Sequence, residues 1–206
     1  MTVLVPRSPR SVFADALIAK HSVATNVALV TAGVLVVAVL AQVSISLWPV
    51  PLTGQTLGVI LVGSALGARR GAMALTIYML AGLAGLPIFA DFTGGPLSVL
   101  KPSFGFIIGF IVAAYVVGKL AEHEWDKKFW KALAAFGLAS FIPFAFGLPY
   151  LAIVLGNLGY DNSFSAVLAA GFTPFIVGGI VKALLAAAVS PIAWRGVQKL
   201  DRNRPS

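Results

Sequence analysis

Lys182 is the residue whose type and position most directly suggest chemistry, because it stands alone in an apolar stretch of membrane-spanning length. The stretch from Phe175 to Ala193 contains no other charged side chain. An ammonium group at the centre of a membrane-spanning helix costs about 2.5–3.5 kcal/mol on insertion scales. Either the flexible side chain carries the ammonium group to the lipid headgroups, or the ammonium group faces the protein interior as the counter-charge of a ligand. We favour the second interpretation.

Few other polar side chains lie in the apolar stretches. Gln55 follows Pro51 by four residues and begins a predicted helix near one membrane surface. Its amide donates two hydrogen bonds and accepts others, which suits an amide or a urea-like ligand, but it equally suits a helix cap. Tyr78 is most simply a packing residue. Gly178 and Gly179 lie about one turn before the lysine and either admit a ligand or allow a close helix contact.

Catalytic chemistry is poorly supported by the sequence. The two histidines, His21 and His123, are predicted at helix ends outside the bundle, and the chain has no cysteine. The apolar stretches contain no Ser/His pair, HExxH motif or carboxylate pair, so an intramembrane hydrolase would lack its base. A Walker-type glycine loop is also absent. We therefore predict no catalytic residue, no cofactor and no metal site.

The composition indicates an integral membrane protein. Of the 206 residues, 59% are hydrophobic and only 11% are charged, whereas a soluble domain carries about 25% charged residues. The mean hydropathy is +0.94. The net charge of +8 arises from basic residues placed between hydrophobic blocks, so nucleic-acid binding is not predicted. The first apolar stretch is too long for a cleaved signal peptide.

The elements that must position these side chains are predicted to be transmembrane helices. A bilayer core about 30 Å thick requires about 20 apolar residues per helix. Two of the stretches, 55–68 and 71–86, are short and lie on either side of Arg69 and Arg70. They can cross the membrane only as a tight helical hairpin, within a bundle that is thin at this point or that shields the two arginines. We predict an all-α membrane protein, with residues 1–206 forming one compact bundle of six transmembrane helices: 26–47, 55–68, 71–86, 104–120, 132–155 and 175–194.

The distribution of basic residues predicts the orientation. With six spans, thirteen of the fifteen lysines and arginines fall on one side, Lys101 alone lies on the other, and Lys182 lies within a span. The positive-inside rule places the basic side in the cytoplasm. We therefore expect residues 1–22 to form a cytoplasmic N-terminal segment and residues 195–206 a basic cytoplasmic tail, in a multi-pass protein of the inner (plasma) membrane.

Two polar loops are predicted on the outer side. Residues 90–102 are rich in glycine and proline and hold Asp91 and Lys101, the close acid–base pair on that side. Residues 156–165 include Asn157 and Tyr160. Together they either form a lid over a cavity or are ordinary solvated connections.

Five segments in order give the chain a close resemblance to a known family. They are PVPLTGQTLGV at 49–59, GARRGA at 67–72, GLPIFA at 85–90, PSFGFIIGF at 102–110, and residues 174–183 around the lysine. The chain resembles the BioY family, the biotin-binding substrate-capture (S) components of energy-coupling-factor (ECF) vitamin transporters. The resemblance covers essentially the whole six-helix body.

The resemblance implies a biotin pocket near the outer surface and names residues for it. Lys182 matches the family's lysine, but the family's acid three residues earlier is Gly179 here. Another group, Asn157 or Gln55, would then replace its contacts with the ring of biotin. Lys101 stands at a position that varies in the family, where a basic residue meets the valerate carboxylate.

The chemistry of biotin suits this assignment. Biotin is a neutral bicyclic urea with an apolar chain ending in a carboxylate, so an apolar cavity with few hydrogen-bonding groups and one or two cations is expected. Asp91 of the outer loop and Tyr78 complete the predicted polar site. The candidate walls are Phe89, Phe92, Phe104, Phe106 and Tyr150.

Three alanines suggest a surface for a partner. Ala24, Ala28 and Ala32 follow one another at four-residue spacing, and such rows of small residues let another helix approach closely, although alanine is common in membrane helices. The row resembles the alanine motif with which S components dock their coupling subunit.

The sequence therefore predicts a high-affinity biotin-binding membrane component that captures biotin outside the cell. Its expected partners are the lipid bilayer, a transmembrane coupling subunit and two cytoplasmic ATPases. The alternatives are an S component for another vitamin and a self-sufficient biotin facilitator that works without ATPases.

Overall fold

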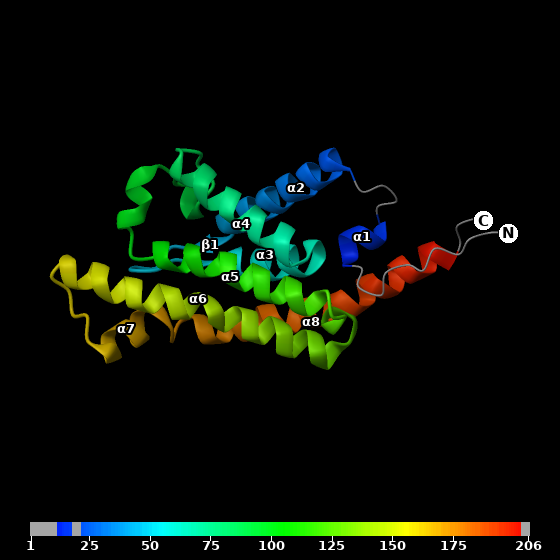
Figure 1. Ribbon diagram of the computed structural model, residues 1–206. Helices are drawn as coiled ribbons and strands as arrows, with labels where there is room; N and C mark the ends of the chain where they lie inside the picture. The colour runs from blue at the N-terminus through cyan, green and yellow to red at the C-terminus, as the bar shows by residue number, and fades with distance from the viewer. Residues whose placement is uncertain (1–11, 18–21, 203–206) are drawn as a thin grey trace.

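The computed structural model describes residues 12–17 and 22–202, with side chains described as far as Gly196. Most of the predicted N-terminal segment 1–22, with Arg7, Arg10, Lys20 and His21, lies outside the described residues. The chain forms an elongated helical bundle, with α1 and the end of α8 at one end and α7 at the other (Figure 1). The elements in order are α1 (Phe13–Leu17), α2 (Val23–Gln42), β1 (Ser44–Ile45), β2 (Leu52–Thr53), α3 (Gln55–Leu66), α4 (Ala68–Leu83), η1 (Ala90–Phe92), η2 (Pro96–Leu100), α5 (Phe104–Ala121), η3 (Trp125–Lys127), α6 (Phe129–Asn157), α7 (Phe164–Gly171) and α8 (Phe175–Arg202).

Four helices in the described part of the chain are long and apolar enough to cross a membrane. They are α2, α5, α6 and the Phe175–Gly196 part of α8. Helix α3 is apolar but has only 12 residues, and α4 has 16. A helix therefore stands at each of the six predicted stretches, and two of the six are short.

The first predicted helix ends five residues earlier than expected. Residues 43–47 do not continue α2, because Ser44–Ile45 pairs in antiparallel fashion with Leu52–Thr53. Proline has no N–H and fixes its φ angle, so Pro49 and Pro51 favour extended and turn backbone in this segment. The result is a β-hairpin between α2 and α3.

Helix α7 was not predicted. It follows the loop after α6, and its N-cap is Ser163, whose Oγ accepts a hydrogen bond from Ala166 N at 3.4 Å. Its eight residues are too few for a span, so hydropathy over a window of membrane length does not detect it.

The α3–α4 hairpin turns at Gly67, whose φ of +85° favours glycine. Gly63 allows the hairpin to approach α5 closely, since a β-carbon on it would lie 2.7 Å from the main-chain oxygen of Ala114. Glu122, at the end of α5, accepts a hydrogen bond from Ala68 N at 3.0 Å. The short hairpin is thereby enclosed by its neighbours at this end.

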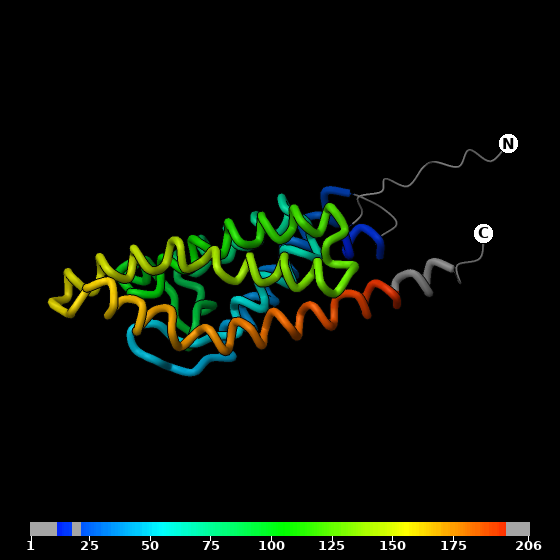
Figure 2. Tube along the Cα trace, turned by 90° about the horizontal axis from the view of Figure 1, so that it is seen from below, coloured from blue at the N-terminus to red at the C-terminus, as the bar shows by residue number. Residues whose placement is uncertain are grey.

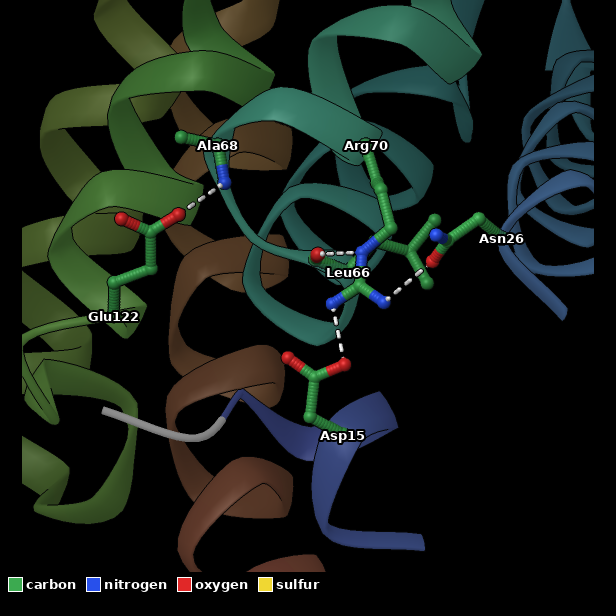
Figure 3. Close-up of polar contacts among 6 residues, drawn as sticks. All are labelled: Asp15, Asn26, Leu66, Ala68, Arg70 and Glu122. Atoms are coloured by element: carbon green, nitrogen blue, oxygen red, sulfur yellow. Dashed lines mark hydrogen bonds and ion pairs between the residues drawn. The ribbon is translucent and has the colours of Figure 1, made fainter. Parts of the chain in front are cut away.

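Arg70 fastens the hairpin to the first two helices (Figure 3). Its guanidinium donates to Leu66 O at 2.9 Å, to the Asp15 carboxylate at 2.7 Å and to Asn26 Oδ1 at 3.4 Å. A planar fork of donors suits three acceptors from three elements. Arg70 therefore joins α1, α2 and α3 at the end of the bundle where α1 lies.

The core divides into two clusters. The larger lies among α2, α3, α4 and α5, and extends to α6 and α7. The smaller joins α6 to α8, and most of its members are alanines, packed around Phe136. One face of α8 remains outside both clusters and carries exposed aliphatic side chains such as Val177. An apolar exposed face of this kind suits contact with lipid.

Candidate functional site

A cavity of about 610 Å³ lies among α3, α5, α6, α8 and the loops that precede α3 and α5. This volume is within the range of about 300–1,000 Å³ typical of small-molecule sites. The walls come from segments within residues 46–56, 89–93, 98–110, 133–144 and 172–184. Most of the lining side chains are apolar, and a few polar ones stand among them.

The hairpin between α2 and α3 covers one side of the cavity. Residues 46–53 all contribute to its wall. The segment lies beside the N-terminal part of α8, as the cyan and orange tubes of Figure 2 show. The Trp48–Pro49 peptide bond is cis, and the Trp48 ring lies 4.6 Å from that of Tyr160, centroid to centroid. A ligand in the cavity is therefore enclosed in part by this hairpin.

Lys182 faces the interior of the bundle. Its half-buried side chain lines the cavity, and its Nζ donates to the main-chain oxygen of Thr53 at 2.5 Å. The lysine thus holds the hairpin to α8. An ammonium group has three donors, so others are available to a ligand.

Gln55 belongs to a chain of buried hydrogen bonds beside the lysine. Its Oε1 accepts from Thr53 Oγ1 at 2.9 Å, and its Nε2 donates to the Tyr78 hydroxyl at 2.7 Å. The Tyr78 hydroxyl donates in turn to Ile88 O at 2.9 Å. The Gln55 side chain does not cap its helix. It lines the cavity with one N–H and one lone pair of its amide still available.

Asp91 binds the hairpin and not Lys101. Its carboxylate accepts hydrogen bonds from Ser44 Oγ at 2.5 Å and from Ser46 Oγ at 3.2 Å. The acid–base pair suggested by the sequence is therefore not formed. Asp91 has a φ of +58°, a left-handed conformation that Asp tolerates better than most residues. Lys101 lines the cavity and has no ion pair among the described residues.

Gln42, at the end of α2, binds the loop that carries Asp91. Its Nε2 donates to Phe89 O at 3.2 Å, and its Oε1 accepts from Phe92 N at 2.9 Å. Gln42 lies inside the predicted span 26–47, and the sequence did not show which segment its amide would bind.

The structure brings some of the predicted site residues to the cavity and leaves others outside it. Phe89, Phe104 and Phe106 line it together with Gln55, Asp91, Lys101, Gly179 and Lys182. Tyr78 lies behind the wall, with its ring 5.4 Å from that of Phe89.

Three predicted contacts are absent from the cavity wall. Tyr150 donates its hydroxyl to the main-chain oxygen of Val99 and packs beside Phe104. Asn157 is exposed at the end of α6, which is too far along that helix to reach the wall. Phe92 is 71% exposed, because the left-handed turn at residues 91–92 directs it outward.

Glycines open the cavity between α6 and α8. Gly137 and Gly179 line it, and a β-carbon on either would have no atom within 4 Å. The site where the family carries an acid is therefore open space here. Gly178 makes only ordinary contact, since its β-carbon would lie 3.6 Å from Leu52 Cδ1.

Several lining residues were missed from the sequence. Thr53, which accepts from Lys182, stands within a family motif, but its main-chain role has no sequence signal. Ser98 lies on η2 and Ser140 lies within α6. Single serines in apolar segments are too common to be singled out without the fold.

The alanine row is exposed. Ala24, Ala28 and Ala32 all lie on an open face of α2, whereas the adjacent Gly33 is buried against α3 and α4. The row is thus accessible to another helix.

Comparison with known proteins identifies close relatives. The model of the BioY family matches residues 12–199. A biotin transporter BioY of Rhizobium etli is 37% identical over 167 residues, which cover 78% of this chain and 86% of that protein. A biotin transporter BioY of Thermotoga maritima is 35% identical over 150 residues, which cover 73% and 84%.

One solved structure has the same fold. It is the crystal structure of an S-component for biotin from an ECF-type ABC transporter, with a TM-score of 0.56 and 20% sequence identity. The match covers 90% of this chain and 96% of that one.

Proposed function

Because this chain belongs to the BioY family, we propose that it binds biotin in the cavity beneath the α2–α3 hairpin, as the S component of a vitamin uptake transporter. The observation that carries the proposal is the position of Lys182, which turns its ammonium group from the lipid toward a largely apolar cavity. One donor of the ammonium group bonds to Thr53 O, and a ligand with a polar head in the cavity would accept from the donors that remain.

The two ends of biotin fit different parts of the wall. At the urea end, Lys182 offers donors, and Gln55 offers one free donor and one free acceptor. At the other end, Lys101 lines the cavity, has no ion pair within the described part of the chain and suits the carboxylate. Of the two residues suggested as substitutes for the family acid, Gln55 is favoured, since Asn157 does not reach the cavity.

We further propose that six helices, namely α2, α3, α4, α5, α6 and α8, cross the membrane with both termini in the cytoplasm. Helices α3 and α4 would cross together, enclosed by α2 and α5. The α3–α4 turn and the connection from α5 to α6 lie at the same end of the bundle as α1 (Figure 1), and the basic residues Arg69, Lys119, Lys128 and Lys131 lie in or next to these segments. Lys101 belongs to the segment that precedes α5. The positive-inside rule then supports a multi-pass protein of the plasma membrane.

The exposed alanine row of α2 supports docking to a transmembrane coupling subunit, with two ATPases supplying energy for translocation. A self-sufficient biotin facilitator is the alternative. Uptake by vesicles that contain this chain alone would favour the facilitator, and uptake that requires the ATPases would exclude it.

One observation supports a second class of ligand, a vitamin other than biotin. Gly179 leaves open space where the family acid would stand, and the changed wall suits a different vitamin. A thermal-shift screen across the B vitamins and biotin tests both proposals with the purified protein. Stabilisation by biotin is expected, and stabilisation by another vitamin without any effect of biotin would refute biotin as the substrate.

A further inference from the structure

Ser98 is a buried polar residue of the cavity wall with no partner in the protein. Its side chain is 3% exposed, and it stands in the η2 turn between Gly95 and Lys101. Its Oγ makes no hydrogen bond. Among the described residues, the only other enclosed side-chain oxygen or nitrogen without a partner is Asp126 Oδ1, which lies far from the cavity in η3.

The other buried polar side chains of the wall, Thr53, Gln55 and Ser140, each have a hydrogen-bond partner in the protein. Thr53 and Gln55 bond to each other, and Ser46 donates to Asp91. Ser140 donates to Phe136 O at 2.8 Å. Buried hydroxyl groups are normally paired, and an unpaired one in a native protein requires an explanation.

A bound ligand supplies the missing partner. Ser98 contributes to the cavity wall, and rotation of χ1 between staggered rotamers can direct its hydroxyl into the cavity. The same turn ends at Lys101, whose main-chain N–H donates to Ser98 O at 3.1 Å. A hydroxyl and an ammonium group from one turn form a donor pair that suits a carboxylate.

We propose that Ser98 is a specificity-determining residue that donates its hydroxyl to the ligand carboxylate beside Lys101. The proposal rests on the proposed function and deepens it by assigning the acidic end of biotin to the η2 turn. Lys182 and Gln55, which stand on α8 and α3, are then left for the ring.

The proposal predicts opposite effects of one substitution on stability and on binding. Ser98→Ala removes a buried hydroxyl that has no partner, so the ligand-free protein should melt at the same temperature or higher. The same change removes a hydrogen bond to a charged ligand group, which should weaken biotin binding about 10-fold or more. A purely structural serine would not separate the two effects.

Ser64→Ala is the matched control, because Ser64 is a buried serine of α3 that lies outside the cavity wall and donates its hydroxyl to Leu61 O at 3.3 Å. Removing its hydroxyl should leave biotin affinity within about twofold, since its hydrogen bond goes to the protein.

The experiment measures biotin affinity by isothermal titration calorimetry and melting temperature by intrinsic fluorescence, with the full chain in lipid nanodiscs. Biotin methyl ester serves as the second ligand. Ser98→Ala should cost the ester clearly less affinity than the acid, because the ester carbonyl accepts only a neutral hydrogen bond, which is weaker than a charge-assisted one.

Three results would overturn the proposal. Unchanged biotin affinity in Ser98→Ala would exclude the hydrogen bond. An equal loss for acid and ester would exclude the carboxylate as its acceptor. Failure of wild type to bind biotin would remove the proposed function and this assignment together, which distinguishes it from the first two results.

Discussion

Replacing Lys182 by methionine tests the central electrostatic claim about this cavity. Methionine keeps a flexible unbranched side chain and removes the charge. In the structure, Lys182 Nζ donates to Thr53 O at 2.5 Å and lines the cavity. The substitution therefore removes one charged hydrogen bond to the hairpin and the donors that face the ligand.

The expected magnitude follows from the bond that a ligand would make with this ammonium group. A hydrogen bond to a charged group contributes about 1.5–3 kcal/mol, which corresponds to a loss of about 10-fold to 150-fold in affinity. Removing a charge from a membrane-embedded site also lowers the cost of insertion. The melting temperature of the ligand-free variant should therefore fall little or not at all.

Labelled biotin binding to purified protein in nanodiscs measures the effect, with the melting temperature recorded in parallel. Lys128→Met is the matched control, since Lys128 is an exposed lysine before α6, remote from the cavity, and should bind biotin like wild type. If Lys182→Met binds biotin within about twofold of wild type while remaining folded, the lysine is not a ligand counter-charge and the reasoning fails.

Three further predictions concern other parts of the molecule. Gly179→Asp should fit without a clash, because the space beside Gly179 is open, and an acid three residues before Lys182 should tighten biotin binding measurably in the same assay; weaker binding would contradict the assignment of the ring end. Burial raises the pKa of Asp126 in η3, and the hydrogen bond from Trp194 opposes this shift. The protonated Asp126 side chain therefore contributes to stability at low pH, and this contribution is lost as pH rises through the folded-state pKa. Asp126→Asn should therefore raise the melting temperature at pH 8 and have little effect at pH 4. Each kcal/mol of stability should change the melting temperature by about 2–4 °C. An equal change in melting temperature at pH 4 and pH 8 would contradict a raised pKa. Ala28→Trp, on the exposed face of α2, should leave melting temperature and biotin binding unchanged but prevent co-purification with a coupling subunit, and normal co-purification would exclude this row as the docking surface.

The class of protein and the places of its long helices could be predicted from the sequence, because hydropathy over about 20 residues is a local property. The predicted starts at Gln55, Phe104 and Phe175 coincide with those of α3, α5 and α8. Membership of the BioY family was also evident from motifs in order, and the family model confirms it.

The composition of the site was only partly predictable. The lone charge at Lys182 and the amide at Gln55 could be singled out, since polar groups are rare in apolar helices. Asn157 and Tyr150 could not be excluded, because their distance from the cavity depends on how far α6 extends and on where its side chains point.

The contacts that enclose the cavity were decided by the tertiary structure alone. Asp91 pairs with Ser44 and Ser46, which precede it by 47 and 45 residues, and Lys182 reaches Thr53 across 129 residues. Such partners depend on which helices pack together and in what register, and hydropathy carries no information on either. The sequence thus determined that a cation would stand within the membrane, whereas packing of α8 against the hairpin decided that it faces a cavity and not the lipid.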